Sequence, residues 1–373
     1  MHIKSLSLNN FRNFSSQKIN FKQDLIIFVG QNGSGKTNIL EAIWYLSIPR
    51  SFRVKRDHYL IKWGEAYARL SGLIEDQDAC KEVVAFLECG GDKTCVFPKD
   101  GRGKVKKELK VNNAKVRAID LLGEFITVLF TPEDINLITA PPQKRRQYLD
   151  MILCQTDTKY CHHLMDYKRV LAQRNKLLVS IQKNLTHESS LDVWDERLIE
   201  LGLSIIKKRQ EVFKFFEQDV RIAYQRLSSS KENLSLLYLP RINADREKFE
   251  ATVISNRQRD IMRGRTGTGP HRDDFVFLLD SKQVSQCGSR GECRSAILAM
   301  KEAELSYIEE ITHRKPVLLL DDVFSELDDK RQQELLGLTK GRQTFVTTTG
   351  LGDILETLAD KHQTFEIKDG QIV

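Results

Sequence analysis

A glycine-rich loop, GQNGSGKT at residues 30–37, constrains this chain more than any other part of its sequence. The loop fits the phosphate-binding pattern G-x-x-x-x-G-K followed by serine or threonine. It follows a short apolar run, DLIIFVG, and precedes TNILEAIWYLS, in which apolar residues recur at helical spacing. Because this pattern belongs where a strand passes through a loop into a helix, the sequence predicts a phosphate-binding site within an α/β fold.

Each residue type in this loop suits a phosphate ligand. The glycines let the backbone come close, so that N–H groups surround the β- and γ-phosphates of a nucleotide. Lys36 is expected to neutralise charge on those phosphates, and the hydroxyl of Thr37 is expected to ligate magnesium. The predicted nucleotide-binding residues of this segment are Gly30, Gln31, Asn32, Gly33, Ser34, Gly35, Lys36, Thr37 and Asn38.

A second apolar strand, VLLLDD at residues 317–322, ends in two acids. In a nucleotide-hydrolysing site Asp321 would hold magnesium through water, and Asp322 would polarise the attacking water. An acidic pair after four apolar residues is common, so the pair alone does not identify such a site. The segment VFSELDD that follows it strengthens the prediction.

The chain separates into three regions. Residues 1–145 mix strands and helices, residues 146–258 are almost all helical, and residues 259–373 return to strands alternating with helices. In the middle region two apolar stripes, interrupted by LTHESSLD, predict two long antiparallel helices that form a short coiled-coil-like arm. An ordinary helical lobe is the alternative. The outer regions are expected to form one split domain in which both contribute strands to a shared sheet.

Composition limits the classes of protein to consider. The chain has 373 residues and a formal net charge of +7, which supports nucleic-acid binding only weakly. No apolar run approaches the roughly 18 residues needed to span a bilayer. The first residues lack the apolar block of a signal peptide. Seven cysteines without a CxxC pair favour reduced thiols, and we expect a cytoplasmic protein without a membrane partner.

Several motifs together resemble a known family. A phosphate loop, then SRGECR at residues 289–294, then LLLDDVFSELD is the order found in ATP-binding-cassette ATPases, including the SMC-like repair proteins. In detail the chain resembles the RecF family, through FRNF, RSFR, FTPED and GPHRDDF at residues 11–14, 50–53, 130–134 and 269–275. The resemblance implies an ABC/SMC-type P-loop ATPase head that is split in sequence by a mostly helical lobe.

The resemblance also assigns roles in a dimer. It implies that two heads pack head-to-tail, so that Ser289, Gly291 and Glu292 of one subunit close over ATP held by Lys36 of the other. It places Ser325–Asp328 at the contact between subunits and adds Asp328 to the nucleotide-contacting residues. The alternative for Asp328 is a cap on the helix that begins near it. The implied catalytic residues are Asp322, Lys36 and Thr347. Either Thr347 or Thr348 stands where transporter ATPases have a histidine.

Two of the resembling motifs carry alternatives. The structural alternative for FTPED is a proline-capped helix start. For GPHRDD a structural role is favoured over a phosphate contact. The basic segment PRSFRVKR is either a solvated face or a DNA surface, and Arg53, Lys55 and Arg56 are the residues predicted to contact DNA.

The function implied by the resemblance is an ATP-dependent DNA-binding protein of recombinational repair and replication maintenance. Such a protein dimerises on ATP, binds double-stranded and gapped DNA, and acts as a weak DNA-stimulated ATPase in which slow hydrolysis is the release switch. It would help to load recombinase at single-strand gaps in the SOS response, with RecO, RecR and RecA as partners. The alternative is an SMC-like chromosome-organising head, although only about 110 residues separate the two α/β pieces here.

Overall fold

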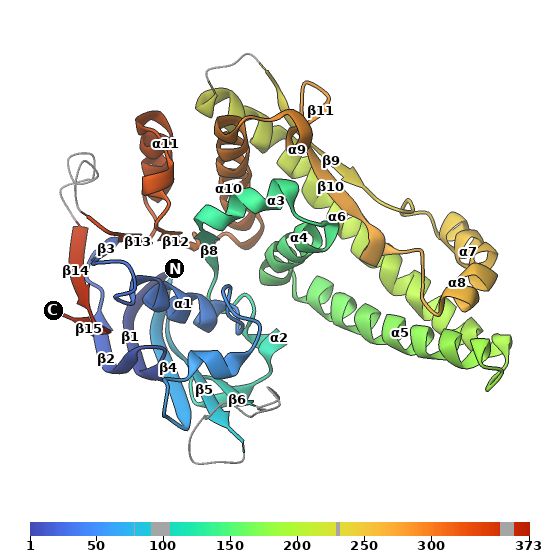
Figure 1. Ribbon diagram of the computed structural model, residues 1–373, viewed down its shortest axis with the longest axis horizontal. Helices are drawn as coiled ribbons and strands as arrows, with labels where there is room; N and C mark the ends of the chain where they lie inside the picture. The colour runs from blue at the N-terminus through green and yellow to red at the C-terminus, as the bar shows by residue number, and fades with distance from the viewer. Residues whose placement is uncertain (78, 91–104, 229–231, 351–361) are drawn as a thin grey trace. The chain divides into compact units, whose positions relative to one another are not determined.

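The computed structural model describes residues 1–77, 79–90, 105–228, 232–350 and 362–373 (Figure 1). The chain divides into two compact units, of which the first comprises residues 1–134 and 308–373 and the second residues 135–307. The predicted boundaries lay instead after residues 145 and 258. The difference arises because β10 (Asp274–Leu279) contacts α4 (Pro142–Thr156), so that strands following the helical insertion pack with it.

The centre of the first unit is a mostly parallel sheet with the strand order β15-β14-β3-β13-β12-β8. Adjacent strands from β14 to β8 pair in parallel, and β15 pairs antiparallel with β14. The prediction that both outer regions share one sheet is therefore confirmed. The strands are β3 (Leu25–Val29), β8 (Thr127–Phe130), β12 (Val317–Asp321), β13 (Thr344–Thr348), β14 (His362–Lys368) and β15 (Gln371–Ile372).

An antiparallel sheet with the order β2-β1-β4-β5-β6-β7 completes the first unit. Helix α1 (Lys36–Ser47) contacts β4 and β5 of this sheet and β8, β12 and β13 of the parallel sheet, so it is covered on both sides. Its apolar residues at positions 39, 40, 43 and 46 are fully buried. The strands are β1 (His2–Phe11), β2 (Phe14–Asn20), β4 (Tyr67–Asp76), β5 (Ala79–Cys89), β6 (Val105–Val111) and β7 (Ala114–Val116).

Short helices join the strands of the first unit. They are η1 (Asp57–Leu60), α2 (Ala118–Leu121), η2 (Pro132–Ile135), η5 (Phe324–Glu326) and α11 (Asp329–Thr339). Within FTPED, η2 starts at Pro132 and the carboxylate of Asp134 accepts the N–H of Thr131 at 2.7 Å. The proline-capped helix start predicted for this motif is therefore confirmed.

Two long helices dominate the second unit. Helix α5 (Thr158–Gln182) and helix α6 (Asp192–Leu227) run side by side in opposite directions and are joined through η3 (Glu188–Leu191). At 1.5 Å per residue, the 36 residues of α6 extend about 54 Å. This pair confirms the predicted antiparallel arm. The unit also contains α3 (Asn136–Thr139), α7 (Arg246–Ser255), α8 (Arg257–Arg263), η4 (Pro270–Arg272), α9 (Val284–Cys287), α10 (Arg290–Thr312), whose last turn enters the first unit, β9 (Leu234–Leu239) and β11 (Lys282–Gln283).

Buried charges hold the arm to its neighbours. The fully buried Arg174 of α5 donates to Asp195 at 2.5 Å, and to Asp260 and Thr266 at 2.8 Å each. Asp195 also accepts hydrogen bonds from Arg257. Each charge of this cluster has an opposite charge or a hydrogen-bond donor close by, which offsets the cost of removing it from water.

The GPHRDD motif lies in a second buried cluster of the same unit. Asp273 accepts the hydroxyl of Tyr238 at 2.5 Å and pairs with Arg209 at 3.3 Å. The ring nitrogen Nδ1 of His271 lies 2.7 Å from the hydroxyl of Tyr167. Asp274 pairs with an arginine of α4 at 2.7 Å. The favoured structural interpretation of this motif agrees with these internal contacts.

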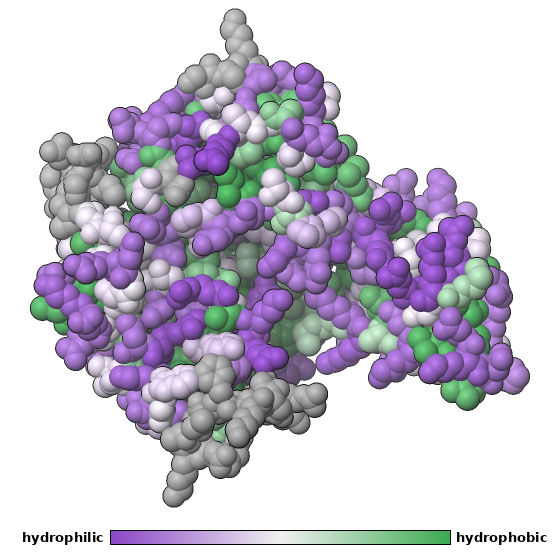
Figure 2. All heavy atoms as spheres, in the orientation of Figure 1, coloured by the Kyte–Doolittle hydropathy of each residue, from purple (hydrophilic) through white to green (hydrophobic). Residues whose placement is uncertain are grey.

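The structure also bears on the predictions of reduced cysteines and of a chain without a membrane-spanning segment. Free thiols are found at Cys80, Cys154, Cys161, Cys287 and Cys293, whereas Cys89 is disulfide-bonded. The expectation of reduced thiols is thus confirmed for these five and wrong for Cys89. In the described part of the chain no helix is long and apolar enough to cross a bilayer, and the face shown in Figure 2 is mostly hydrophilic.

Candidate nucleotide-binding site

The glycine-rich loop joins β3 to α1, as the sequence predicts. Gly35 has a φ of +119°, and a Cβ atom there would lie 2.6 Å from the side-chain nitrogen of Asn13. A Cβ atom on Gly30 would lie 2.3 Å from the carbonyl oxygen of Ile367. Glycine is therefore favoured at Gly35 by the positive φ and at Gly30 by the close approach of the Ile367 backbone. Between them Gln31, Asn32 and Gly33 are exposed and Ser34 is buried.

The ammonium of Lys36 lies inside the curve of this loop. It donates to the carbonyl oxygen of Gly30 at 2.6 Å and to that of Gln31 at 3.0 Å. Burial lowers the pKa of Lys36, and the carboxylates of Asp322 and Asp321 oppose this shift. Those two acids are therefore close enough to act on Lys36 electrostatically. The structure thus brings together three predicted site residues that the sequence separates by about 285 positions.

A hydrogen-bonded chain fixes the two acids. The hydroxyls of Thr37 and Thr347 each donate to Oδ1 of Asp321 at 2.8 Å, and the N–H of Asp322 donates to the hydroxyl of Thr347 at 2.9 Å. Burial raises the pKa of Asp321, and both threonine hydroxyls counteract this. Thr347 is buried and bonds only inward, so its geometry is that of a residue that positions Asp321 and Asp322.

Asp322 adopts an unusual backbone conformation, with a φ of +51°. For a residue other than glycine the left-handed region costs of order 1 kcal/mol and is maintained only where neighbouring groups fix it. The hydrogen bond from the N–H of Asp322 to Thr347 supplies such a constraint. The carboxylate is therefore held directly after the end of β12, next to the loop lysine.

Sequence reasoning missed a group of supporting residues around Asn13. The side chain of Asn13 donates to the carbonyl of Ser34 at 2.9 Å and accepts from the side chain of Asn38 at 2.8 Å. Its neighbour Arg12 forms two hydrogen bonds of 2.7 Å with the fully buried Glu41 of α1. The FRNF motif was the available signal, since it lies in a turn that the fold places beside the loop.

The basic residues predicted to contact DNA occupy two environments. Arg53 donates to Oδ1 of Asn38 at 2.8 Å, and its charge lowers the pKa of Asp321 after the larger effects of burial and the threonine hydroxyls. This arginine is therefore tied to the nucleotide end of the unit. Lys55 and Arg56 are exposed, as a DNA-contacting surface requires.

The SRGECR segment lies in the second unit, at the start of α10. The N–H of Ser289 donates to Oε2 of Glu292 at 2.6 Å, and the N–H of Glu292 donates to the hydroxyl of Ser289 at 3.2 Å. This is a capping box, in which serine and glutamate satisfy each other's backbone donors. These bonds lower the pKa of Glu292, so it is a carboxylate at neutral pH. Gly291 lies in the first turn of the same helix.

The SELD segment caps the following helix. Asp328 is the residue before α11, and its carboxylate accepts the N–H of Arg331 at 3.0 Å. The hydroxyl of Ser325 donates to the carbonyl of Asp322 at 2.9 Å. The alternative predicted for Asp328, a helix cap, is confirmed. The segment is also joined to the acidic end of β12.

The donor set at the end of β12 suits a hard divalent cation. The hydroxyl of Thr37 donates to the carboxylate of Asp321 at 2.8 Å, so the two oxygens lie next to each other. Magnesium is typically bound by one or two such oxygens, with phosphate oxygens and water completing its shell. Glu133 of FTPED is close enough to raise the pKa of Asp321 slightly, which adds negative charge to the same position.

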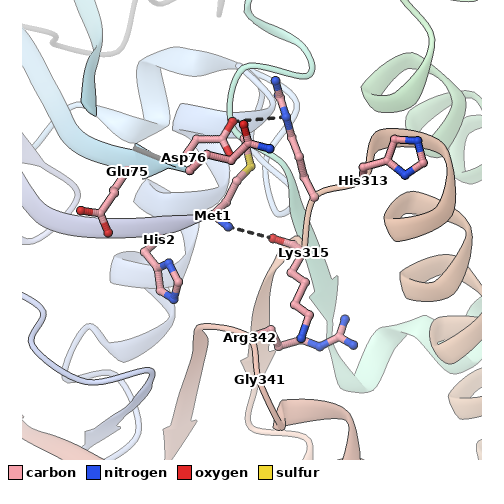
Figure 3. A pocket seen from close by; sticks show the side chains of 10 residues that line it. Met1, His2, Glu75, Asp76, His313, Lys315, Gly341 and Arg342 are labelled. Atoms are coloured by element: carbon pink, nitrogen blue, oxygen red, sulfur yellow. Dashed lines mark hydrogen bonds and ion pairs between the residues drawn. The ribbon is translucent and has the colours of Figure 1, made fainter. Parts of the chain in front are cut away.

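A pocket of about 350 Å³ lies elsewhere, at the amino-terminal ends of β12 and β13 (Figure 3). Its lining includes His2, Asp76, Lys315 and Arg342, and Arg314 pairs there with Asp76 at 3.2 Å. Asp321 and Thr347 stand at the opposite, carboxyl ends of the same two strands. The pocket is therefore separate from the nucleotide site.

Comparison with known proteins identifies relatives of this chain. Residues 2–367 match the model of the family described as RecF/RecN/SMC N terminal domain. The chain is 38% identical to the DNA replication and repair protein RecF of Natranaerobius thermophilus over 394 residues, which covers 100% of this chain and 98% of that protein. It is also 38% identical to RecF of Leptospira interrogans over 377 residues, which covers 100% of this chain and 99% of that protein.

Among solved structures, a RecF protein and an Smc head domain are similar to this chain. The recombination mediator protein RecF of the RecFOR pathway, solved as RecF-ATP, matches with a TM-score of 0.88 at 34% identity. That match covers 100% of this chain and 96% of the other. An Smc head domain from Pyrococcus furiosus matches with a TM-score of 0.54 at 18% identity, which shows a shared fold alone.

Proposed function

The chain belongs to the RecF family of DNA replication and repair proteins, and on that premise we propose that it is an ATP-dependent DNA-binding switch of recombinational repair and replication maintenance. The observation that carries this proposal is the convergence of Lys36, Thr37, Asp321 and Asp322 at one end of the parallel sheet. A site with this composition suits the phosphates of a nucleoside triphosphate.

ATP is the proposed ligand of the loop. A related RecF is solved as RecF-ATP, and the loop geometry here supports the same ligand. Thr37 and Asp321 would hold Mg²⁺, which would neutralise charge on the phosphates and leave the protein side chains to position them. Lys36 would exchange its contacts with the loop carbonyls for contacts with phosphate oxygens. Asp322 would accept the proton of the attacking water.

Dimerisation is the second element of the proposal. Ser289, Gly291 and Glu292 of one subunit, together with Asp328, would complete the site of the other subunit. Two identical chains related by a two-fold axis would then contain two shared sites. Because Glu292 already occupies the N–H of Ser289 and carries a negative charge, it would have to turn away from an arriving γ-phosphate. Dimerisation would thus compete with the capping box.

DNA is the proposed target of the ATP-bound dimer, and slow hydrolysis would release it. Lys55 and Arg56 are exposed and suit phosphate contacts, which carry little sequence information. Double-stranded DNA and single-strand/double-strand junctions would be bound, and the protein would help to load RecA at gaps together with RecO and RecR. The related RecF belongs to the RecFOR pathway by name, which supports these partners.

An SMC-like chromosome-organising head is the second candidate. The likeness to an Smc head supports it at the level of the fold. The arm argues against it, because α5 and α6 contain 25 and 36 residues. Helices of this length reach about 55 Å at most. The RecF interpretation is therefore preferred.

The deciding experiment compares DNA affinity with ATP, with ADP and without nucleotide. We expect tight binding only with ATP, little sequence preference, and an affinity that falls steeply with salt as counterions are released. Equal affinity with ATP and ADP would refute the switch.

Shared sites can be tested by mixing two inactive variants. Lys36→Met should not hold ATP, and Ser289→Arg should block the contact from the other subunit. If sites are shared, a mixed dimer contains one intact site, and about half of randomly paired dimers are mixed. ATP-dependent crosslinking of a tagged Lys36→Met chain to an untagged Ser289→Arg chain measures this directly. A mixture that neither crosslinks nor regains activity would exclude the shared site.

A further inference from the structure

Trp63 is an exposed aromatic side chain in a fold that buries or half-buries its other two tryptophans. The residue is 73% exposed, whereas Trp44 is 3% exposed and Trp194 is half-buried. Burying a large aromatic ring is among the most favourable contributions that a side chain makes to folding. A largely exposed tryptophan ring is accessible to a ligand, and tryptophan is enriched at binding surfaces because its ring is both apolar and able to donate a hydrogen bond.

The turn that carries Trp63 has a fixed base. The N–H of Glu65 donates to the carbonyl of Lys62 at 3.0 Å, which closes the turn. The N–H of Lys62 donates to the carbonyl of Asn10 at 2.8 Å, and the side chain of Asn10 donates back to Glu65 at 3.1 Å. Because both ends of the turn are bonded to β1, the ring is presented to solvent from a defined position.

The sequence that leads into this turn is basic. Residues 50–65 contain five lysines and arginines and two acids, and one of the acids, Asp57, is paired with Lys107 at 2.7 Å. Lys55 and Arg56 are exposed, and Tyr59 is 41% exposed. Burial lowers the pKa of His58 and the nearby charge of Arg56 lowers it further, so this histidine adds no charge of its own near pH 7. We call Tyr59 and Trp63, with Lys55 and Arg56, the tryptophan platform.

We infer that the tryptophan platform stacks on unpaired bases of a DNA strand. This inference rests on the proposed DNA-binding function and names the part of the DNA that is selected. Every base has an apolar face, but in a duplex those faces are covered by neighbouring base pairs. Only a gap, a tail or a frayed end offers a free face, while lysine and arginine hold the phosphates on either side.

The positive charge of this segment favours a nucleic-acid strand over a protein partner. An apolar protein surface would gain little from the cations of residues 50–65, whereas a nucleic-acid strand has one negative charge for each base that it offers. The tryptophan platform therefore gives a physical reason why the proposed protein would prefer single-strand/double-strand junctions over continuous duplex.

The experiment compares three DNAs in the presence of ATP. They are a blunt duplex, the same duplex with a ten-nucleotide single-stranded tail, and the same tailed duplex whose tail consists of abasic sugar-phosphates. The abasic tail keeps the negative charge and removes the bases. Wild type should bind the normal tail about 5- to 100-fold more tightly than the abasic tail, as expected for stacking of one base or a few. Tryptophan fluorescence should be quenched by the normal tail alone.

Variants assign the effect to the ring. Trp63→Ala should bind both tails equally, and Trp63→Phe should retain part of the preference. Leu185→Ala is the matched control, because Leu185 is 74% exposed and lies in the other unit. It should behave as wild type. ATP affinity should be unchanged in all three variants.

The possible outcomes separate the inference from the proposed function. If wild type binds the normal and abasic tails equally, or if Trp63→Ala keeps the preference, the stacking inference is wrong and the DNA-binding function stands. If wild type with ATP binds none of the three DNAs, both are wrong. The comparison of the two tails uses wild type alone, so a variant that folds poorly cannot produce a false result.

Discussion

Replacing Arg174 by methionine should destabilise the helical unit more than any surface change. The arginine is fully buried and donates three hydrogen bonds, to Asp195, Asp260 and Thr266. Methionine has a similar length and is apolar, so it fills most of the space without replacing the charge. The perturbation thus tests the charge of Arg174 with little change of packing volume.

The structure sets the size of the effect. Asp195 would keep Arg257, which donates to it at 2.7 Å. Asp260 would keep only the N–H of Gly267 at 3.0 Å and would remain 3% exposed. Removing one partner of a buried ion pair costs about 3–5 kcal/mol when the other charge is left uncompensated. Since only one of the two acids loses its countercharge, we expect about 3 kcal/mol.

Hydrogen exchange measured by mass spectrometry, together with urea unfolding, would resolve this loss within the second unit. Arg174→Met should speed exchange in α5 and α8, while β3 and β12 of the first unit stay protected. Adding Asp260→Asn removes the stranded charge and should restore about 1–2 kcal/mol. The control is Arg169→Met, whose exposed pair with Asp166 should contribute less than about 1 kcal/mol. A loss below about 1 kcal/mol for Arg174→Met, or no recovery in the double variant, would refute the reasoning.

Three further predictions concern single residues. Burial lowers the pKa of His271 to about 4, below its ordinary 6.5. The unfolded chain therefore binds this proton first as the pH falls. The free energy of unfolding should be highest above pH 6.5 and should decrease by up to about 3 kcal/mol as the pH falls toward 4. His271→Gln should flatten urea midpoints measured across that range. Glu292→Gln should lower the ATP concentration for half-maximal dimerisation about five-fold, since roughly 1 kcal/mol of repulsion disappears; light scattering that shows no shift would contradict this. Asp322→Asn should slow ATP turnover about 100-fold or more while the dimer persists longer, and wild-type phosphate release from this variant would count against a general base there.

The sequence predicts the residues of the nucleotide site whose signal is local. Lys36 and Thr37 stand within a continuous motif, and Asp321 and Asp322 end an apolar strand, so each can be assigned from its neighbours. The role of Thr347 differs from the prediction in kind, because its hydroxyl bonds to the acids and not to an open position. Such a role depends on which strand lies beside β12, and no local pattern contains that information.

The features that the sequence does not predict depend on contacts between segments that are distant in the chain. Asn13 acts on the phosphate loop across about 20 residues, and Arg12 meets Glu41 across about 30, through a turn whose sequence names no partner. Arg53 resembles its basic neighbours in sequence, but the fold ties it to Asn38. The predicted boundary after residue 258 differs from the observed one after residue 307 for a related reason. The sequence predicts strands in this region, but only the packing of β10 against α4 shows that β10 belongs to the helical unit.

The strand order of the parallel sheet has a consequence for synthesis on the ribosome. Among the strands that the structure describes, β3 lies between β14 and β13 and β8 pairs only with β12, so neither early strand has a described partner in the first 134 residues. β12 begins about 190 residues after β8 ends. At a translation rate of about 5–20 residues per second, β8 waits about 10–40 seconds for β12. β3 waits about 15–60 seconds, because β13 begins about 315 residues after β3 ends. The arm can fold during this delay, whereas the nascent sheet depends on chaperones or on the antiparallel sheet beside it to keep those edges from aggregating.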